Sequence, residues 1–276
     1  MQRFPSTFFL FFYQIALGGL FGLAATPFHE IDRAFYKSTG AVLFVIAALG
    51  LWGKSRIYLE SISNGMTLPM VAEALVHILF VVFFASYLIS LWEENQRFRA
   101  NCFAASLLTG FAGLLFIAHG SYHAPFFSAE TGIYPIAFFL SSLLLGSVTV
   151  GMLIGHWYLI DAGQSLSPFL RLYKFFLIAL IAQTAFSLLA LMVLYLAGTP
   201  ATLEAINRMW RDHWTLLLTR IFIGQIAPLG LAVMIWRTLK IPHTMAATGL
   251  FYIALLGVFV GEILARQILA LTSLPF

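Results

Sequence analysis

The sequence predicts an all-α integral membrane protein with about eight transmembrane helices, arranged as two four-helix bundles. Of its 276 residues, 61% are hydrophobic and only 9% carry a charge, whereas a soluble domain has about 25% charged residues. Runs of roughly 20 apolar residues, the length that crosses a bilayer, recur along the whole chain. We therefore expect a single polytopic membrane domain over residues 1–276 and almost no soluble part.

The first two predicted spans cover residues 6–26 and 36–53. The first is an apolar run longer than the roughly 7–15-residue core of a signal peptide, so we expect it to be retained as a helix. Its glycines Gly18, Gly19 and Gly22 allow a neighbouring helix to approach closely, which favours an inner position. The second span is the shortest and also contains glycines.

The six remaining spans follow from the same criterion of apolar length. They are expected at residues 66–91, 100–121, 134–157, 173–198, 214–236 and 244–271. Because the number of spans is even, both termini lie on one side of the membrane. We name this side A and the opposite side B.

Basic residues indicate which side faces the cytoplasm. Side B carries eight of them, at Arg33, Lys37, Arg97, Arg99, Arg171, Lys174, Arg237 and Lys240, and side A carries five, at Arg3, Lys54, Arg56, Arg208 and Arg211. Cytoplasmic loops are enriched in Lys and Arg. The distribution therefore favours side B as cytoplasmic and places both termini on the outer side.

Strongly polar side chains inside the apolar spans are the best indication of function, because they are costly in hydrocarbon and usually face a partner, a cavity or a substrate path. Glu73 and His77 lie roughly 10 and 16 Å from side A and share one helix face. Gln14 lies about 12 Å from side A, and Arg220 about 9 Å. The last span brings Glu262 and Arg266 to the same depth. We expect these side chains to form one polar layer in the side A half, which becomes thinner toward side B.

The roles expected within this layer differ. Glu262 and Arg266 are four residues apart, so they can pair along one helix, and Arg220 can join them in a structural charge cluster between the last two spans. Glu73 has no basic residue on its own span. An unpaired carboxyl in hydrocarbon becomes protonated, and a carboxyl that gains and loses a proton suits quinol oxidation. His77 could share that proton, hydrogen-bond a quinone carbonyl, or equally make an interhelical hydrogen bond.

Three segments carry a family resemblance. They are Gln14-Ile15-Ala16-Leu17-Gly18-Gly19, Leu218-Thr219-Arg220-Ile221 and Gly261-Glu262-Ile263-Leu264-Ala265-Arg266. In this order they resemble the Gln-x-x-x-Gly-Gly, the Trp/Ser-Arg-Ile and the Gly-Glu-x-x-x-Arg patterns of the membrane-anchor subunit of DMSO reductase and related quinol-oxidising anchors. Ser55-Arg56-Ile57-Tyr58 and the later Glu73 are similar to a basic residue and a glutamate of that family, whose glutamate is implicated in menaquinol binding. Where the family has a His-Leu-Gly turn, this chain instead has Leu51-Trp52-Gly53-Lys54.

The resemblance implies a quinone-reactive anchor subunit of a respiratory oxidoreductase in the bacterial inner membrane. Glu73 would be the catalytic residue, and Glu73, His77, Arg56 and Gln14 would contact the quinone, either menaquinone or ubiquinone. Electrons would pass to an iron–sulfur or c-type haem subunit that is bound, with a catalytic subunit, on side A. We expect the chain to hold no metal centre of its own and to contact membrane lipid but no nucleic acid.

Three alternatives remain open from the sequence. A haem b cytochrome needs two inward histidines at one depth, but His77 lies mid-membrane while His119 and His156 lie at opposite ends. A polytopic transporter also fits eight helices with buried charge, although a polar path to side B is not evident. In a purely structural anchor the polar layer would only stabilise the bundle.

Overall fold

The computed structural model describes residues 3–26, 28–63, 65, 67–122, 124–125, 127–161, 163–241 and 243–276. Within these residues the regular structure is entirely helical, and eight of the helical segments are long and apolar enough to cross a membrane. The predicted eight-span helical fold is therefore confirmed.

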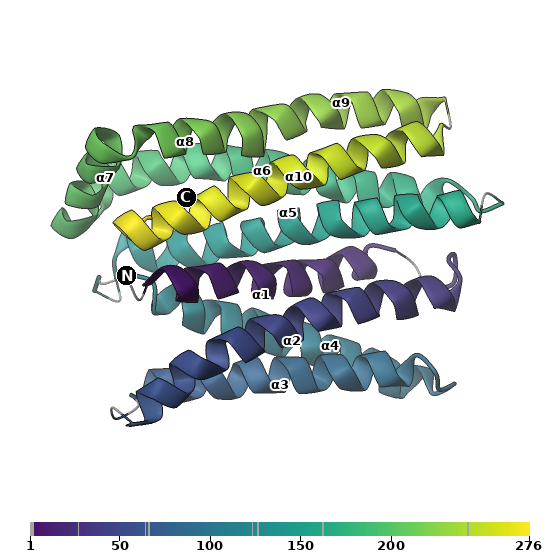
Figure 1. Ribbon diagram of the computed structural model, residues 1–276, viewed down its shortest axis with the longest axis horizontal. Coiled ribbons are helices and arrows are strands. Elements are labelled where there is room, and N and C mark those ends of the chain that lie inside the picture. The colour runs from purple at the N-terminus through teal and green to yellow at the C-terminus, as the bar shows by residue number, and fades with distance from the viewer. Residues whose placement is uncertain are drawn as a thin grey trace.

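The first four spans form one half of the molecule. They are α1 (Arg3–Ala24), α2 (Arg33–Ser63), α3 (Leu68–Ser90) and α4 (Gln96–His119). Helix α1 packs against α2 and α4, while α3 packs against both α2 and α4. These helices make up the lower half of Figure 1, as one four-helix bundle.

The second half contains α5 (Ala129–Ile160), α6 (Ser167–Ala197), a composite seventh span and α10 (Thr244–Thr272). The seventh span consists of α8 (Trp214–Ile221), the π-helical turn η1 (Phe222–Ile226) and α9 (Ala227–Lys240). A short helix that was not predicted, α7 (Pro200–Asp212), precedes it at the end of the bundle where both termini lie (Figure 1). Helix α10 packs against α5 and α9, and α6 against α5 and α9, which completes the second predicted bundle.

Helix α1 joins the two bundles by a very close crossing with α5. A Cβ atom built on Gly18 would lie 1.6 Å from the carbonyl oxygen of Ser142, and one built on Gly146 would lie 1.8 Å from the carbonyl carbon of Gly18. Only glycine allows two backbones to approach in this way. Helix α1 also contacts α2, α4 and α10, so its predicted inner position is confirmed.

Several helices are longer than the sequence predicts, and the difference matters most in α2. This helix continues to Ser63 instead of ending at Gly53, so Lys54 and Arg56 lie inside a helix. Gly53 does not end the helix but makes room for α1, because a Cβ atom at this position would lie 2.0 Å from the ring of Phe9. The prediction of a short second span was wrong because it assigned this glycine to a boundary.

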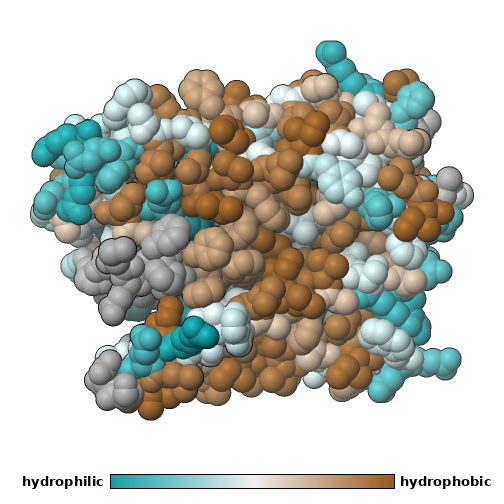
Figure 2. Space-filling view, viewed as in Figure 1, coloured by the Kyte–Doolittle hydropathy of each residue, from teal (hydrophilic) through white to brown (hydrophobic). Residues whose placement is uncertain are grey.

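The surface has the distribution expected of a membrane-spanning protein. Hydrophobic residues cover the middle of the face shown in Figure 2, and hydrophilic residues gather at both ends of the helices. The chain is a multi-pass membrane protein.

Candidate functional site

The polar residues of the side A half form two clusters, with α1 between them. The Glu73 cluster consists of Tyr13 from α1, Lys54 and Tyr58 from α2, and Glu73 and His77 from α3. The Glu262 cluster consists of Ser141 from α5, Gln183 from α6, Arg220 from α8, and Glu262 and Arg266 from α10. The single layer expected from depth alone is therefore divided.

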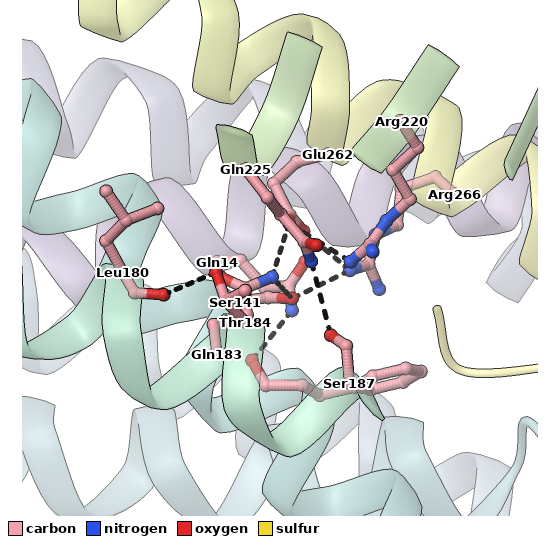
Figure 3. Close-up of polar contacts among 11 residues, drawn as sticks. Gln14, Ser141, Leu180, Gln183, Thr184, Ser187, Arg220, Gln225, Glu262 and Arg266 are labelled. Carbon is pink, nitrogen blue, oxygen red and sulfur yellow. Dashed lines mark hydrogen bonds and ion pairs between the residues drawn. The ribbon is translucent and has the colours of Figure 1, made fainter. Parts of the chain in front are cut away.

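The Glu262 cluster is built around one carboxylate that two guanidinium groups contact (Figure 3). Arg266 Nη2 lies 3.0 Å from Glu262 Oε2, and Arg220 Nη2 lies 3.7 Å from Glu262 Oε1. All three residues are buried, with at most 3% of their surface exposed. The structure thus brings together the three charges that the sequence singled out.

Two polar residues that the sequence did not single out complete this cluster. Gln183 Nε2 donates a hydrogen bond to Glu262 Oε1 and another, 3.1 Å long, to Ser141 Oγ. Arg266 Nη2 also donates to Ser141 Oγ, at 3.1 Å. The cluster therefore connects four of the eight spans, and buried charges need such additional partners to be tolerated.

The π-helical turn brings the seventh span directly against α10 beside this cluster. A Cβ atom built on Gly261 would lie 2.3 Å from the Cα atom of Gly224. Within the same turn, Gln225 Nε2 donates to Ser187 Oγ at 3.4 Å. Because Gly261 directly precedes Glu262, this backbone contact fixes the depth of the carboxylate relative to Arg220, four residues before Gly224.

In the Glu73 cluster, two residues of α2 hold the carboxylate of α3. Lys54 Nζ forms an ion pair with Glu73 Oε1, and Tyr58 OH donates to the same oxygen at 3.0 Å. No basic residue lies on the helix of Glu73, as expected, but the carboxyl is not unpaired. Its partner is on a neighbouring helix, and it was missed because α2 was predicted to end before Lys54.

His77 lies one helical turn deeper on the same face of α3 and is only 1% exposed. Its ring meets the ring of Tyr13 edge-on, with 4.7 Å between the centroids. Within the described part of the chain, neither ring nitrogen has a hydrogen-bond partner. The interhelical hydrogen bond considered for His77 is thus not among the contacts described. Buried polar atoms are nearly always paired, so a buried imidazole with two unpaired nitrogens is unusual.

The other two residues predicted to contact quinone lie elsewhere. Arg56 is exposed, and its guanidinium lies 5.7 Å from the ring centroid of Trp52. Gln14 is fully buried and donates to the carbonyl oxygen of Phe138 on α5, at 2.8 Å. Gln14 therefore joins α1 to α5, on the side of the Glu262 cluster.

The remaining histidines of the spans bond to tyrosines near opposite ends of the bundle. His119 Nδ1 lies 3.1 Å from Tyr122 OH, and His156 Nδ1 lies 3.4 Å from Tyr252 OH. Among the described residues, no three His, Cys, Asp or Glu side chains converge as metal ligands would. The structure does not place either histidine beside His77.

Comparison of the chain with protein-family models and with curated proteins finds no match. The resemblance to the DMSO reductase anchors therefore stays a prediction. The Glu73 cluster is the candidate functional site, because it combines a partly exposed carboxylate with a buried imidazole that has no described hydrogen-bond partner.

Proposed function

We propose that this chain is the quinone-reactive membrane subunit of a multisubunit respiratory oxidoreductase in the bacterial inner membrane. Its substrate is a membrane quinol, menaquinol or ubiquinol. The electrons pass to an iron–sulfur or c-type haem subunit bound at side A, and from there to a catalytic subunit. The observation that carries the proposal is the position of Glu73 above His77 on one face of α3.

The two side chains fit the two oxygen atoms of a quinol. They are one helical turn apart, with roughly 6 Å between their Cβ atoms. This spacing is similar to the distance between the two oxygen atoms of a quinol. Both described contacts of Glu73 use Oε1, which leaves Oε2 for a ligand. Neither ring nitrogen of His77 has a hydrogen-bond partner among the described residues.

Glu73 also lies within reach of the bilayer. Its side chain is 17% exposed, whereas that of His77, one turn deeper, is buried. An apolar quinol diffuses within the hydrocarbon, so it would reach the carboxylate laterally. No passage through the bundle is required.

The chemistry that follows is proton transfer by the protein and electron transfer to the partner. Oxidation of one quinol to quinone releases two electrons and two protons. Glu73 accepts the two hydroxyl protons one after the other and releases each toward side A, while His77 hydrogen-bonds an oxygen atom of the quinol. Lys54 holds the carboxylate of Glu73 in position through their ion pair. The two electrons reduce the metal centres of the partner subunit.

Replacement of the base tests the proposal. Glu73→Gln preserves the size of the side chain but cannot accept the proton, so quinol oxidation by the purified complex should fall roughly 100-fold, a typical contribution of a general base. Glu94→Gln, at an exposed glutamate beyond the opposite end of α3, should have no effect. Partner subunits should co-purify equally with both variants. Normal turnover by the Glu73→Gln complex would exclude the proposed role.

A further inference from the structure

A second polar site lies at the side B end of the first bundle, away from both clusters. A cavity of about 630 Å³ opens between the ends of α1, α2, α3 and α4. Its basic lining residues are His29, Arg33 and Arg99. Ligand sites have volumes of roughly 300–1,000 Å³, so the cavity is large enough for a small molecule.

Arg99 is the residue that points to a ligand. It lies in the first turn of α4 and is only 7% exposed. Its guanidinium lies over the ring of Phe28, 4.4 Å from the ring centroid, as in a cation–π contact. The N–H donors point outward in its plane, and Nη1 is buried without a hydrogen-bond partner among the described residues. A buried donor of this kind is costly when it is unpaired.

The two arginines of the cavity make no ion pair with a carboxylate among the described residues, whereas His29 Nε2 lies 3.8 Å from Glu30 Oε1. Arg33 is a like charge that acts on Arg99. The described hydrogen bond of Arg33 goes to the backbone carbonyl of Glu93, at 3.4 Å. The nearby acids are used elsewhere. Asp32 Oδ1 accepts from the backbone N–H of Ala34 at the start of α2, and Glu30 pairs with Arg171.

The rest of the lining is aromatic and aliphatic. Leu23, Phe28, Tyr36, Tyr87 and Phe103 contribute to it. The cavity lies at the ends of membrane-spanning helices, the level at which lipid headgroups meet water. A small inorganic anion would leave most of this apolar surface uncovered.

We propose that the cavity binds a phosphate group carried by an amphiphile, as in the headgroup of an anionic phospholipid. The phosphate oxygens accept hydrogen bonds from Arg99 and Arg33, since guanidinium groups match phosphate geometry. The glycerol backbone and the first acyl carbons cover the aromatic lining. This inference does not depend on the proposed reaction with quinol.

Isothermal titration calorimetry on the full chain in neutral detergent tests the site with three probes. These are dioctanoyl phosphatidylglycerol, dioctanoylglycerol, which lacks the phosphate, and inorganic phosphate. We expect saturable binding of the phospholipid and none of dioctanoylglycerol. Arg99→Gln should weaken phospholipid binding roughly 10- to 100-fold, the value of one or two charge-assisted hydrogen bonds. Arg99→Lys, which keeps the charge and checks that the site is folded, should lose less.

Arg97→Gln is the matched control, because Arg97 is an exposed cation two residues away on α4 and does not line the cavity. It should bind phospholipid as the wild type does. Inorganic phosphate that binds and competes with the phospholipid would support the phosphate site, and comparison of the two affinities would show what the amphiphile adds. Equal losses in Arg97→Gln and Arg99→Gln, or equal binding of dioctanoylglycerol and phosphatidylglycerol, would overturn the proposal.

Discussion

The Glu262 cluster predicts a large loss of stability when its single carboxylate is neutralised. Glu262→Gln preserves the size and shape of the side chain, although it keeps only one of the two oxygens that accept hydrogen bonds. It leaves Arg220 and Arg266, whose side chains are 4% and 2% exposed, without the carboxylate that both contact. The substitution therefore removes charge from a buried site with little change in packing.

The magnitude follows from the two distances. At an effective dielectric constant of about 20, Coulomb's law gives about 5.5 kcal/mol for charges 3.0 Å apart and about 4.5 kcal/mol for charges 3.7 Å apart. Part of this attraction offsets the cost of removing the charges from water, so it is not all net stability. Breaking a buried ion pair by removing one partner costs about 3–5 kcal/mol. We expect the free energy of unfolding to fall by that amount.

The assay is unfolding by sodium dodecyl sulfate in mixed micelles, followed by circular dichroism. Glu204→Gln provides the control, because Glu204 and Arg208 are also four residues apart on a helix but are 78% and 50% exposed. That substitution should cost less than about 0.5 kcal/mol. If Glu262→Gln also cost less than about 1 kcal/mol, burial would not be what makes the cluster strong, and the account of it would be wrong.

Two further pairs of variants test the ion pair of Lys54 with Glu73 and the close crossing of α1 with α5. Lys54→Met should slow quinol oxidation about 10-fold or more, because Glu73 loses the ion pair that positions its carboxylate. Arg56→Met, which removes an exposed cation, should retain turnover in the same assay. A larger loss in Arg56→Met than in Lys54→Met would restore the role first expected for Arg56. Gly18→Ala should destabilise the protein by about 1–3 kcal/mol, because the added Cβ atom meets the backbone of α5. Gly230→Ala, where nothing lies within 4 Å of the added atom, should be neutral or stabilise the protein by up to about 1 kcal/mol. Equal effects of the two substitutions in detergent unfolding would contradict the close crossing.

The eight spans could be predicted because a bilayer imposes a length of roughly 20 apolar residues on each of them. The end of α2 could not, since Lys54-Ser55-Arg56 interrupts the apolar run while the helix continues to Ser63. Helix α7 was missed for a related reason: it is a short segment with polar residues, and it does not span the membrane. The π-helical turn at Phe222–Ile226 depends on the contact between Gly224 and Gly261, which lie far apart in sequence.

Among the polar residues, contacts within one helix could be predicted and contacts between helices could not. Glu262 and Arg266 could be paired from the sequence because both lie on one helix, where residues four apart are neighbours. The pairing of Lys54 with Glu73 could not be predicted, because it depends on how α2 and α3 are aligned. Gln183 and Ser141 join the Glu262 cluster from two other helices, so their contacts could not be predicted either.

The most direct test of the central claim is to locate the quinone. A photoreactive azidoquinone, irradiated with the purified complex and followed by mass spectrometry of its peptides, should label the segments of α2 and α3 that contain Lys54, Tyr58, Glu73 and His77. An excess of unmodified quinone should abolish this labelling. Labelling confined to other helices, or labelling that excess quinone does not reduce, would contradict a quinone site at the Glu73 cluster.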